Sequence, residues 1–275
     1  MTGGSLVRSR REQKPKVTSA GAGRREEVRP RPVSGNRGPQ DPPSVTASRP
    51  GSEGNDGRAT GRRTTPVLPP SLRASLGLIA ALATLLGVAL GVLYAGRNRP
   101  GGVDGWIQPS VDGVPPPWRN IALGVDFLAE PAGAAALVVA AVSGCLLLRW
   151  PRAAVLVVVG AVLTVGATKL LKPLVGRTIH DGHLSYPSGH TAFLTALALM
   201  AALLAVGRLG LGRTAGTALA LGAALVAGAA MGWAQIALGA HYPTDTLGGW
   251  CTALAVTPAT AWLVDRTAGR RRERR

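Results

Sequence analysis

Long apolar segments, separated by short polar ones, occupy almost the whole chain after residue 72 of its 275. Each is close to the ~20 residues that an α-helix needs to cross a bilayer, and the frequent Gly and Ala let helices pack closely in lipid. The pattern predicts an all-α fold, a bundle of six transmembrane helices. A short surface helix is expected at 121–128, because Asp126 and Glu130 keep that stretch out of lipid. The six spans are expected at about residues 75–95, 132–148, 153–171, 191–206, 217–238 and 246–264.

The first 70 residues differ from the rest in composition. They are rich in Arg, Pro, Gly, Ser and Thr and have almost no large apolar side chains. Such a segment cannot bury enough surface to offset its chain entropy. We therefore expect a disordered basic tail at 1–70, a membrane domain at 71–266 with a core at about 153–264, and a short basic tail at 267–275.

The formal net charge of +17 raises the question of nucleic-acid binding. The basic residues lie mostly in the two tails and in short loops, as the positive-inside bias of membrane proteins predicts, and no nucleic-acid motif accompanies them. We expect no nucleic-acid partner. The charge pattern instead favours an integral protein of the plasma membrane with both termini, and the loops around 149–152 and 208–213, in the cytoplasm.

Two polar segments between the spans carry all four histidines of the chain. They are His180, His183 and His190 in residues 180–190, and His241 in residues 240–245. With six spans and cytoplasmic termini, both segments emerge on the same, non-cytoplasmic side. Ionisable residues gathered at the ends of membrane helices indicate a functional site. Histidines together with Lys172 and Arg177 suit an anionic substrate and proton transfer near neutral pH.

Ser188 and Gly189 precede His190 at the expected start of the fourth span. The first turn of a helix presents unpaired N–H groups and the positive end of the helix dipole, which together bind phosphate well. Ser188 suits either a helix cap or a phosphate ligand, and Gly189 lets a ligand approach the backbone closely. An ordinary helix cap followed by an interfacial histidine is the alternative interpretation.

His241 and Asp245 are four residues apart, so on a helical turn they share one face. An Asp bonded to one imidazole nitrogen fixes the tautomer and leaves the other nitrogen free to attack. A structural His–Asp pair is the alternative, but the histidine-rich segment on the same side favours catalysis. A metal site is a further alternative; the chain has no HExxH or His-x-His spacing, and we expect no metal and no cofactor.

These residues resemble the type 2 phosphatidic acid phosphatase and vanadium haloperoxidase superfamily. Its motifs are Lys-x6-Arg-Pro, Pro-Ser-Gly-His and Ser-Arg-x5-His-x3-Asp. Residues 187–190 match the second motif in full, His241 and Asp245 match the end of the third, and Lys172 opens the first. The resemblance implies a metal-independent phosphatase whose substrate is a lipid phosphate or a polyprenyl (pyro)phosphate of the membrane.

The same resemblance implies a role for each matching residue. His241 attacks phosphorus to give a phosphohistidine, His190 protonates the leaving alkoxide, and Asp245 orients His241. Lys172, Ser188 and the backbone N–H of Gly189 hold the phosphate oxygens. Fixed positive charge and N–H donors around the phosphoryl group are the expected catalytic contribution.

The chain departs from the family pattern at two positions. Ile179 stands where the first motif has its arginine, and Gln235 where the third motif has its own. Each charged hydrogen bond lost weakens phosphate binding by about 1.5–3 kcal/mol. Arg177, two residues before the first vacant position, is expected to serve instead, with His180 and His183 as auxiliaries and Gln235 as a neutral donor.

Two hypotheses follow from these departures. The first is a working phosphatase with a rearranged phosphate pocket. The second is a lipid-phosphate-binding membrane protein with weak or no catalysis. Retention of His190, His241 and Asp245 favours the enzyme, since binding alone does not require all three. A transporter is disfavoured, because the polar residues lie at helix ends rather than at mid-span.

Overall fold

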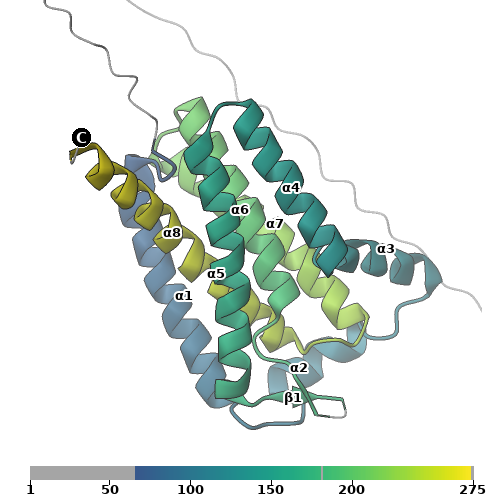
Figure 1. Cartoon of the computed structure of the whole chain (residues 1–275). Coiled ribbons are helices and arrows are strands. Elements are labelled where there is room, and N and C mark those ends of the chain that lie inside the picture. Colours follow the sequence, from purple (N-terminus) through teal and green to yellow (C-terminus); the bar gives the residue numbers. More distant parts are fainter. Residues whose placement is uncertain (1–65, 181, 274–275) are drawn as a thin grey trace, which may run out of the picture. The chain divides into compact units, whose positions relative to one another are not determined.

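The protein is described by a computed structural model that covers residues 66–180 and 182–273. These residues belong to one compact unit, Thr60–Arg275; most of the predicted disordered tail lies outside the described residues. In chain order the elements are η1 (Pro70–Leu72), α1 (Arg73–Leu93), α2 (Gly102–Ile107), η2 (Gln108–Ser110), α3 (Pro116–Phe127), α4 (Pro131–Leu147), α5 (Pro151–Val175), β1 (Thr178–Ile179), β2 (His183–Leu184), α6 (Gly189–Leu209), α7 (Arg213–Ala237) and α8 (Pro243–Glu273) (Figure 1).

Five of the described helices are long and apolar enough to cross a membrane: η1 with α1, and then α5, α6, α7 and α8. The 17-residue α4 completes the predicted set of six when it is counted together with α3, from which it bends by 57°. The all-α bundle of membrane helices predicted from the apolar segments is thus confirmed. The surface helix expected at 121–128 is the second half of α3.

Proline and glycine set the helix ends. Pro151 and Pro243 occupy the first helical positions of α5 and α8, where the missing N–H of proline has no intrahelical acceptor to lose. Gly176 after α5 and Gly210 after α6 adopt the left-handed conformation with φ of 64° and 62°, which ends each helix cleanly. The first of these turns leads directly into the first histidine segment.

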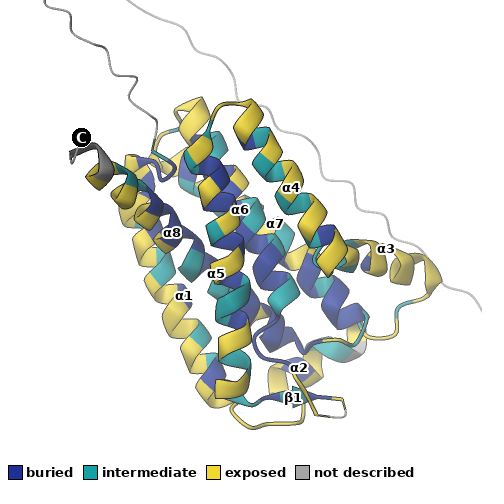
Figure 2. Cartoon of the chain, viewed as in Figure 1, coloured by how far each residue is buried: buried dark blue, intermediate teal, exposed yellow. Residues whose placement is uncertain are grey.

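Helix α6 is the centre of the bundle. It packs against α5, α7 and α8, while α1 packs on α8 and α4 on α5. Figure 2 shows the resulting gradient, with buried residues concentrated on the inner helices and exposed ones on α1 and α4. Many of the exposed side chains are large and apolar, such as Leu82 and Leu85 on α1 and Val139 on α4.

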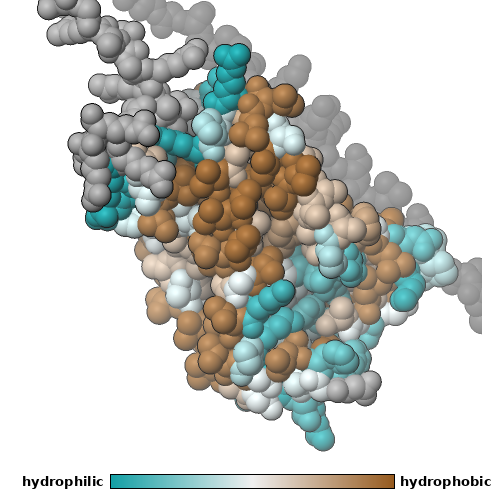
Figure 3. All heavy atoms as spheres, in the orientation of Figure 1, coloured by the Kyte–Doolittle hydropathy of each residue, from teal (hydrophilic) through white to brown (hydrophobic). Residues whose placement is uncertain are grey.

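Apolar side chains also dominate the surface of the bundle. Figure 3 shows them over the middle of the face formed by α4 and α5, with polar side chains gathered toward the two ends. A water-soluble protein rarely exposes a contiguous apolar surface of this extent. The chain is therefore an integral membrane protein whose helices meet lipid along their outward faces.

One end of the bundle carries the short irregular elements. β1 and β2 form a two-stranded antiparallel hairpin that pairs Thr178 with Leu184 and Ile179 with His183. The hairpin and α2 lie at the same end (Figure 1), and α2 packs against α8. Both histidine segments are found here.

Candidate active site

The two histidine segments are hydrogen-bonded to each other. The backbone N–H of Ser188, in the first segment, donates to the backbone carbonyl of Asp245, in the second, at 2.9 Å. Gly249 of α8 makes this contact sterically allowed, because a Cβ there would lie 2.3 Å from the carbonyl oxygen of Ser188. The two histidine segments, which the sequence places at the same end of the bundle, are therefore in direct contact.

His241 and Asp245 form the pair that their spacing predicts. Nδ1 of His241 lies 3.7 Å from Oδ2 of Asp245 and has no hydrogen-bond partner at standard distance. Both residues are buried, with 7% and 0% of their surface exposed. Because Nδ1 is directed at the carboxylate, Nε2 is the nitrogen that remains available for attack.

Burial lowers the pKa of His241 below its ordinary value of 6.5, because the charged imidazolium is poorly solvated there. The neighbouring carboxylate of Asp245 opposes this shift, and the positive charges of Lys172 and His190 reinforce it. His241 is therefore mostly neutral near pH 7, which is the protonation state that a nucleophile needs.

Arg177 lies in the interior behind this pair. It is completely buried, and its two terminal nitrogens donate to Asp104 Oδ2 at 2.6 Å and to Asp245 Oδ1 at 2.7 Å. The sequence predicts Arg177 as a phosphate ligand, but both of these nitrogens are bonded to carboxylates. Asp104 is not among the site residues predicted from the sequence.

His190 lies in the first turn of α6, beside two carboxylates. Its Nε2 is 3.7 Å from Asp126 Oδ1 and 3.9 Å from Glu130 Oε1, and no hydrogen bond satisfies it. The side-chain amide of Gln235 donates to the same Oδ1 of Asp126. The neutral residue at the vacant arginine position thus holds a carboxylate close to His190, a contact between α3 and α7 that no local sequence signal predicts.

The same cluster has the geometry to hold a metal ion. Ligand atoms of Asp126, Glu130 and His190 all lie within 4.8 Å of one another. Two carboxylate oxygens and one imidazole nitrogen suit a divalent cation such as Zn²⁺ or Mn²⁺. The absence of a metal therefore stays a prediction, which chelation can test.

The remaining predicted phosphate ligands surround the start of α6. Ser188 caps the helix, with its Oγ accepting hydrogen bonds from the Thr191 N–H at 3.4 Å and the Thr191 hydroxyl at 3.1 Å. Gly189 is the first helical residue, and the N–H groups of this turn have no intrahelical acceptor. Nζ of Lys172 donates to the carbonyl of Leu184 at 2.7 Å, which leaves two of its three N–H donors for other partners.

The two auxiliary histidines lie in the exposed hairpin. The ring of His180 is hydrogen-bonded to the carbonyl of Gly239 at 2.9 Å, and the ring of His183 to the carbonyl of His180 at 3.2 Å. His180 therefore ties the hairpin to the loop that leads into His241. Neither histidine is buried with the His241–Asp245 pair.

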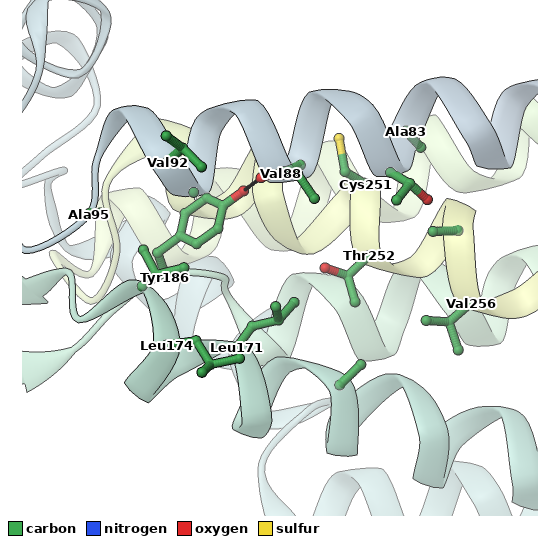
Figure 4. A pocket seen from close by; sticks show the side chains of 16 residues that line it. Ala83, Val88, Val92, Ala95, Leu171, Leu174, Tyr186, Cys251, Thr252 and Val256 are labelled. Atoms are coloured by element: carbon green, nitrogen blue, oxygen red, sulfur yellow. Dashed lines mark hydrogen bonds between the residues drawn. The ribbon is translucent and has the colours of Figure 1, made fainter.

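An apolar pocket of about 350 Å³ lies between α1, α5 and α8 (Figure 4). Tyr186 closes one end of it, and its hydroxyl donates to the carbonyl of Gly87 on α1 at 2.5 Å. The rest of the lining is uncharged and mostly apolar, apart from Thr84 and Thr252, with Ala83 and Val256 toward the other end. This lining provides no charged group that could bind phosphate.

Comparison with known proteins gives two matches. A family profile described as the PAP2 superfamily matches residues 72–268. A solved structure, the crystal structure of the first transmembrane PAP2 type phosphatidylglycerolphosphate phosphatase from Bacillus subtilis, is similar with a TM-score of 0.51 and 21% identity. The similarity covers 72% of this chain and 96% of that chain and concerns the fold. No curated protein sequence matches the chain.

Proposed function

The chain belongs to the PAP2 superfamily, and we propose that it is a membrane phosphatase that hydrolyses a lipid phosphate or pyrophosphate through a phosphohistidine intermediate. One observation carries the proposal: the buried His241–Asp245 pair and His190 lie at the same end of the bundle, where the Ser188–Asp245 backbone hydrogen bond joins the start of α6 to the start of α8. These three residues are the ones that this chemistry requires.

In the first step, Nε2 of His241 forms a bond to phosphorus while the bond from phosphorus to the leaving oxygen breaks. His190 transfers its proton to that oxygen, so the lipid leaves as a neutral alcohol or, from a pyrophosphate, as a protonated phosphate. Asp245 holds Nδ1 of His241 and stabilises the positive charge that develops on the ring.

In the second step, water attacks the phosphohistidine. His190, now neutral, accepts a proton from the water as the new P–O bond forms and the N–P bond breaks. Phosphate is released, and both histidines return to their starting protonation states. The balance of protons closes without a further cofactor.

The phosphate oxygens are held, in this proposal, by the positive end of α6 and by neighbouring side chains. The ligands are Lys172, Ser188, the N–H of Gly189, and Gln235, with His180 and His183 as auxiliaries from the hairpin. Support comes from the free donors of Lys172 and from the N–H groups of Gly189 and His190 in the first helical turn, which have no acceptor within the helix. For Arg177 the buried pairing favours a different role, argued below.

The substrate is a lipid whose phosphate reaches the end of the bundle at head-group depth. Phosphatidic acid, phosphatidylglycerol phosphate and polyprenyl (pyro)phosphates all satisfy this requirement. We place the site on the outer face of the plasma membrane, with both termini in the cytoplasm, because the positive-inside distribution favours this orientation.

A second candidate is a protein that binds lipid phosphates with weak or no turnover. The observation in its favour is that two cations of the family pattern are missing: Ile179 and Gln235 occupy the two family arginine positions, and Arg177 is paired internally. Two absent charged hydrogen bonds correspond to about 3–6 kcal/mol of lost phosphate stabilisation. The two candidates make opposite predictions for turnover.

The test is phosphate release by the protein purified in detergent, with a panel of lipid phosphates as substrates. Wild type and His241→Ala are assayed side by side, each with and without EDTA. We expect release by the wild type in both conditions and a loss on the order of 10³-fold or more in the variant, as for removal of a catalytic nucleophile.

Each other outcome has a distinct meaning. Release that EDTA abolishes would assign the Asp126–Glu130–His190 cluster to a metal and contradict a metal-independent mechanism. Release that survives in His241→Ala would contradict the phosphohistidine. Binding of the lipids without release from any of them would favour the second candidate.

A further inference from the structure

Arg177 is the largest fully buried side chain among the described residues, and it carries a charge. A buried cation is costly unless it is paired and hydrogen-bonded. Here one guanidinium lies between two carboxylates, those of Asp104 and Asp245, and neither of them has exposed side-chain surface. One cation between two anions leaves one net negative charge in the group.

We propose that Asp104 and Arg177 are positioning residues for Asp245. Arg177 fixes the carboxylate of Asp245, and Asp104 balances the charge of Arg177. A net negative charge on Asp245 therefore still faces His241. The inference rests on the proposed function, since it assigns these residues to the same nucleophile. It also removes Arg177 from the phosphate ligands. Asp104, Arg177 and Asp245 are called the ion triad below.

The two oxygens of Asp245 divide their contacts in the way that this role requires. Oδ1 accepts a hydrogen bond from Arg177 Nη1, while Oδ2 accepts one from the backbone N–H of Tyr242 at 3.1 Å and lies 3.7 Å from His241 Nδ1. A carboxylate held at one oxygen cannot rotate away, so the other oxygen stays directed at the imidazole.

The carboxylate of Asp104 is also fixed by hydrogen bonds to both of its oxygens. Its Oδ2 accepts from Arg177 and from the N–H of Gly101, and its Oδ1 accepts from the N–H of Thr244 at 2.9 Å and the Thr244 hydroxyl at 2.8 Å. Burial alone raises the pKa of Asp104, but these hydrogen bonds outweigh it and hold the pKa below its ordinary value. Asp104 is therefore an anion and contributes its full charge.

Two aromatic rings cover the guanidinium of Arg177. The rings of Tyr94 and Tyr242 have their centroids 4.3 and 4.5 Å from its Cζ. Cation–π contacts of this kind stabilise a desolvated guanidinium and keep it from turning. Arg177 thus has no solvent-exposed donor with which to bind a phosphate.

The net charge of the ion triad acts on the imidazole of His241. Without Asp104, the positive charge of Arg177 would cancel that of Asp245, and the imidazolium or phosphohistidine of His241 would lose its counter-charge. The other charged groups that face His241 are Lys172 on α5 and His190 on α6, both of which disfavour its protonation. His190 in turn faces the carboxylates of Asp126 and Glu130.

The test compares wild type with Asp104→Asn and with the double variant Asp104→Asn/Arg177→Met. Asp112→Asn, an exposed carboxylate in the same loop, is the matched control for loss of one negative charge. Two readouts are measured as functions of pH: kcat and KM for phosphate release, and the rate at which diethyl pyrocarbonate modifies His241, followed by mass spectrometry. Only the neutral imidazole reacts, so the midpoint gives the pKa of His241 without any need for turnover.

For Asp104→Asn we expect a fall in kcat of about tenfold, the equivalent of one pKa unit of lost charge stabilisation, with KM nearly unchanged. The His241 midpoint should move to lower pH by about half a unit to one unit, because less negative charge favours the neutral imidazole. The double variant restores the charge of Asp245, so its midpoint should return toward the wild-type value. The Asp112→Asn midpoint should not move.

A midpoint that is the same in wild type and Asp104→Asn, or one that stays displaced in the double variant, overturns the inference. A rise in KM with kcat unchanged in the double variant overturns it as well, because Arg177 would then bind phosphate. If Asp104→Asn proves misfolded by gel filtration, the double variant, which buries no unpaired cation, carries the test through its KM, which should stay near the wild-type value because Arg177 does not bind phosphate. Absence of phosphate release from the wild type would contradict the proposed function and leave the His241 midpoints as an independent result.

Discussion

At the scale of single residues, the site combines groups that the sequence identifies with groups that it does not. His190, His241 and Asp245 stand in recognisable motifs, so their meeting could be predicted. Asp104 and Asp126 could not, because each acquires its role from a partner far along the chain: Asp104 from Arg177, 73 residues away, and Asp126 from Gln235, 109 residues away. Neither aspartate is part of a local pattern, and side-chain contacts of this range are settled only by helix packing.

The lowered pKa of His241 predicts the acidic side of the pH–rate profile. In the proposed mechanism His241 must be neutral to attack, and burial lowers its pKa below 6.5. As pH falls, kcat/KM should therefore stay high through the ordinary histidine range and decline only below it. The measurement is kcat/KM for phosphate release between pH 4.5 and 8; a decline that begins at or above the ordinary histidine value would contradict the buried, neutral nucleophile.

The Gln235→Arg variant tests how much the missing arginine at this position weakens phosphate binding. A guanidinium there would pair with Asp126 and return a fixed cation to the neighbourhood of His190. We expect KM for the lipid phosphate to fall by about tenfold, the lower end of the range for one charged hydrogen bond. Gln235→Leu is the control, since it removes the contact with Asp126 and adds no charge; an equal gain in both variants would refute the explanation.

At the scale of elements, the spans could be predicted because few backbone structures are stable in lipid. Backbone polar groups must be satisfied within each segment, so an apolar run of the right length becomes a helix. The ends were less predictable: α8 begins at Pro243 and continues to Glu273, beyond the expected 246–264. Helices continue into the polar surroundings past the lipid, where hydropathy no longer marks them. The hairpin and α2 are too short to show a hydrophobic period in the sequence.

Gly249→Ala tests how closely α8 approaches the first histidine segment. The added Cβ would lie 2.3 Å from the carbonyl oxygen of Ser188, so one of the two backbones has to shift. We expect a loss of about 1–3 kcal/mol in stability, as for other overpacked sites, and a larger relative loss of activity. Thermal unfolding in detergent and phosphate release measure the two effects.

The matched control is Gly222→Ala on α7. A Cβ at this exposed glycine has nothing within 4 Å. Replacing glycine by alanine within a helix favours the helix by up to about 1 kcal/mol, so stability should stay equal or rise slightly. Similar losses in the two variants would mean that the close contact at Ser188 does not limit packing.

At the scale of the whole molecule, the bundle has a polar end that carries the site and an opposite end that carries the loops around 149–152 and 208–213. The sequence predicts this division, because six spans and the distribution of basic residues determine which loops share a side. It does not predict how far α4 diverges from α3 or which helix takes the centre. Those follow from packing of small side chains, which hydropathy does not encode.

Cysteine labelling tests the orientation in the membrane. Asp112→Cys introduces a thiol at the end that carries the site, and Arg213→Cys one at the opposite end, both at exposed positions. Cys145 and Cys251 are buried and give little background. In intact cells an impermeant maleimide should label the first variant and reach the second only after permeabilisation; the reverse pattern would place the site in the cytoplasm.

The ion triad also constrains how the protein is made. Its members come from the segment after α1, the segment after α5 and the start of α8, so the last of them is synthesised only when the final helix emerges. Until then Arg177 has only the carboxylate of Asp104, and His241 lacks the carboxylate of Asp245 that faces it. Synthesis of α8 therefore completes the ion triad. A chain that ends before α8 would keep the Asp104–Arg177 pair but lack the carboxylate that faces His241.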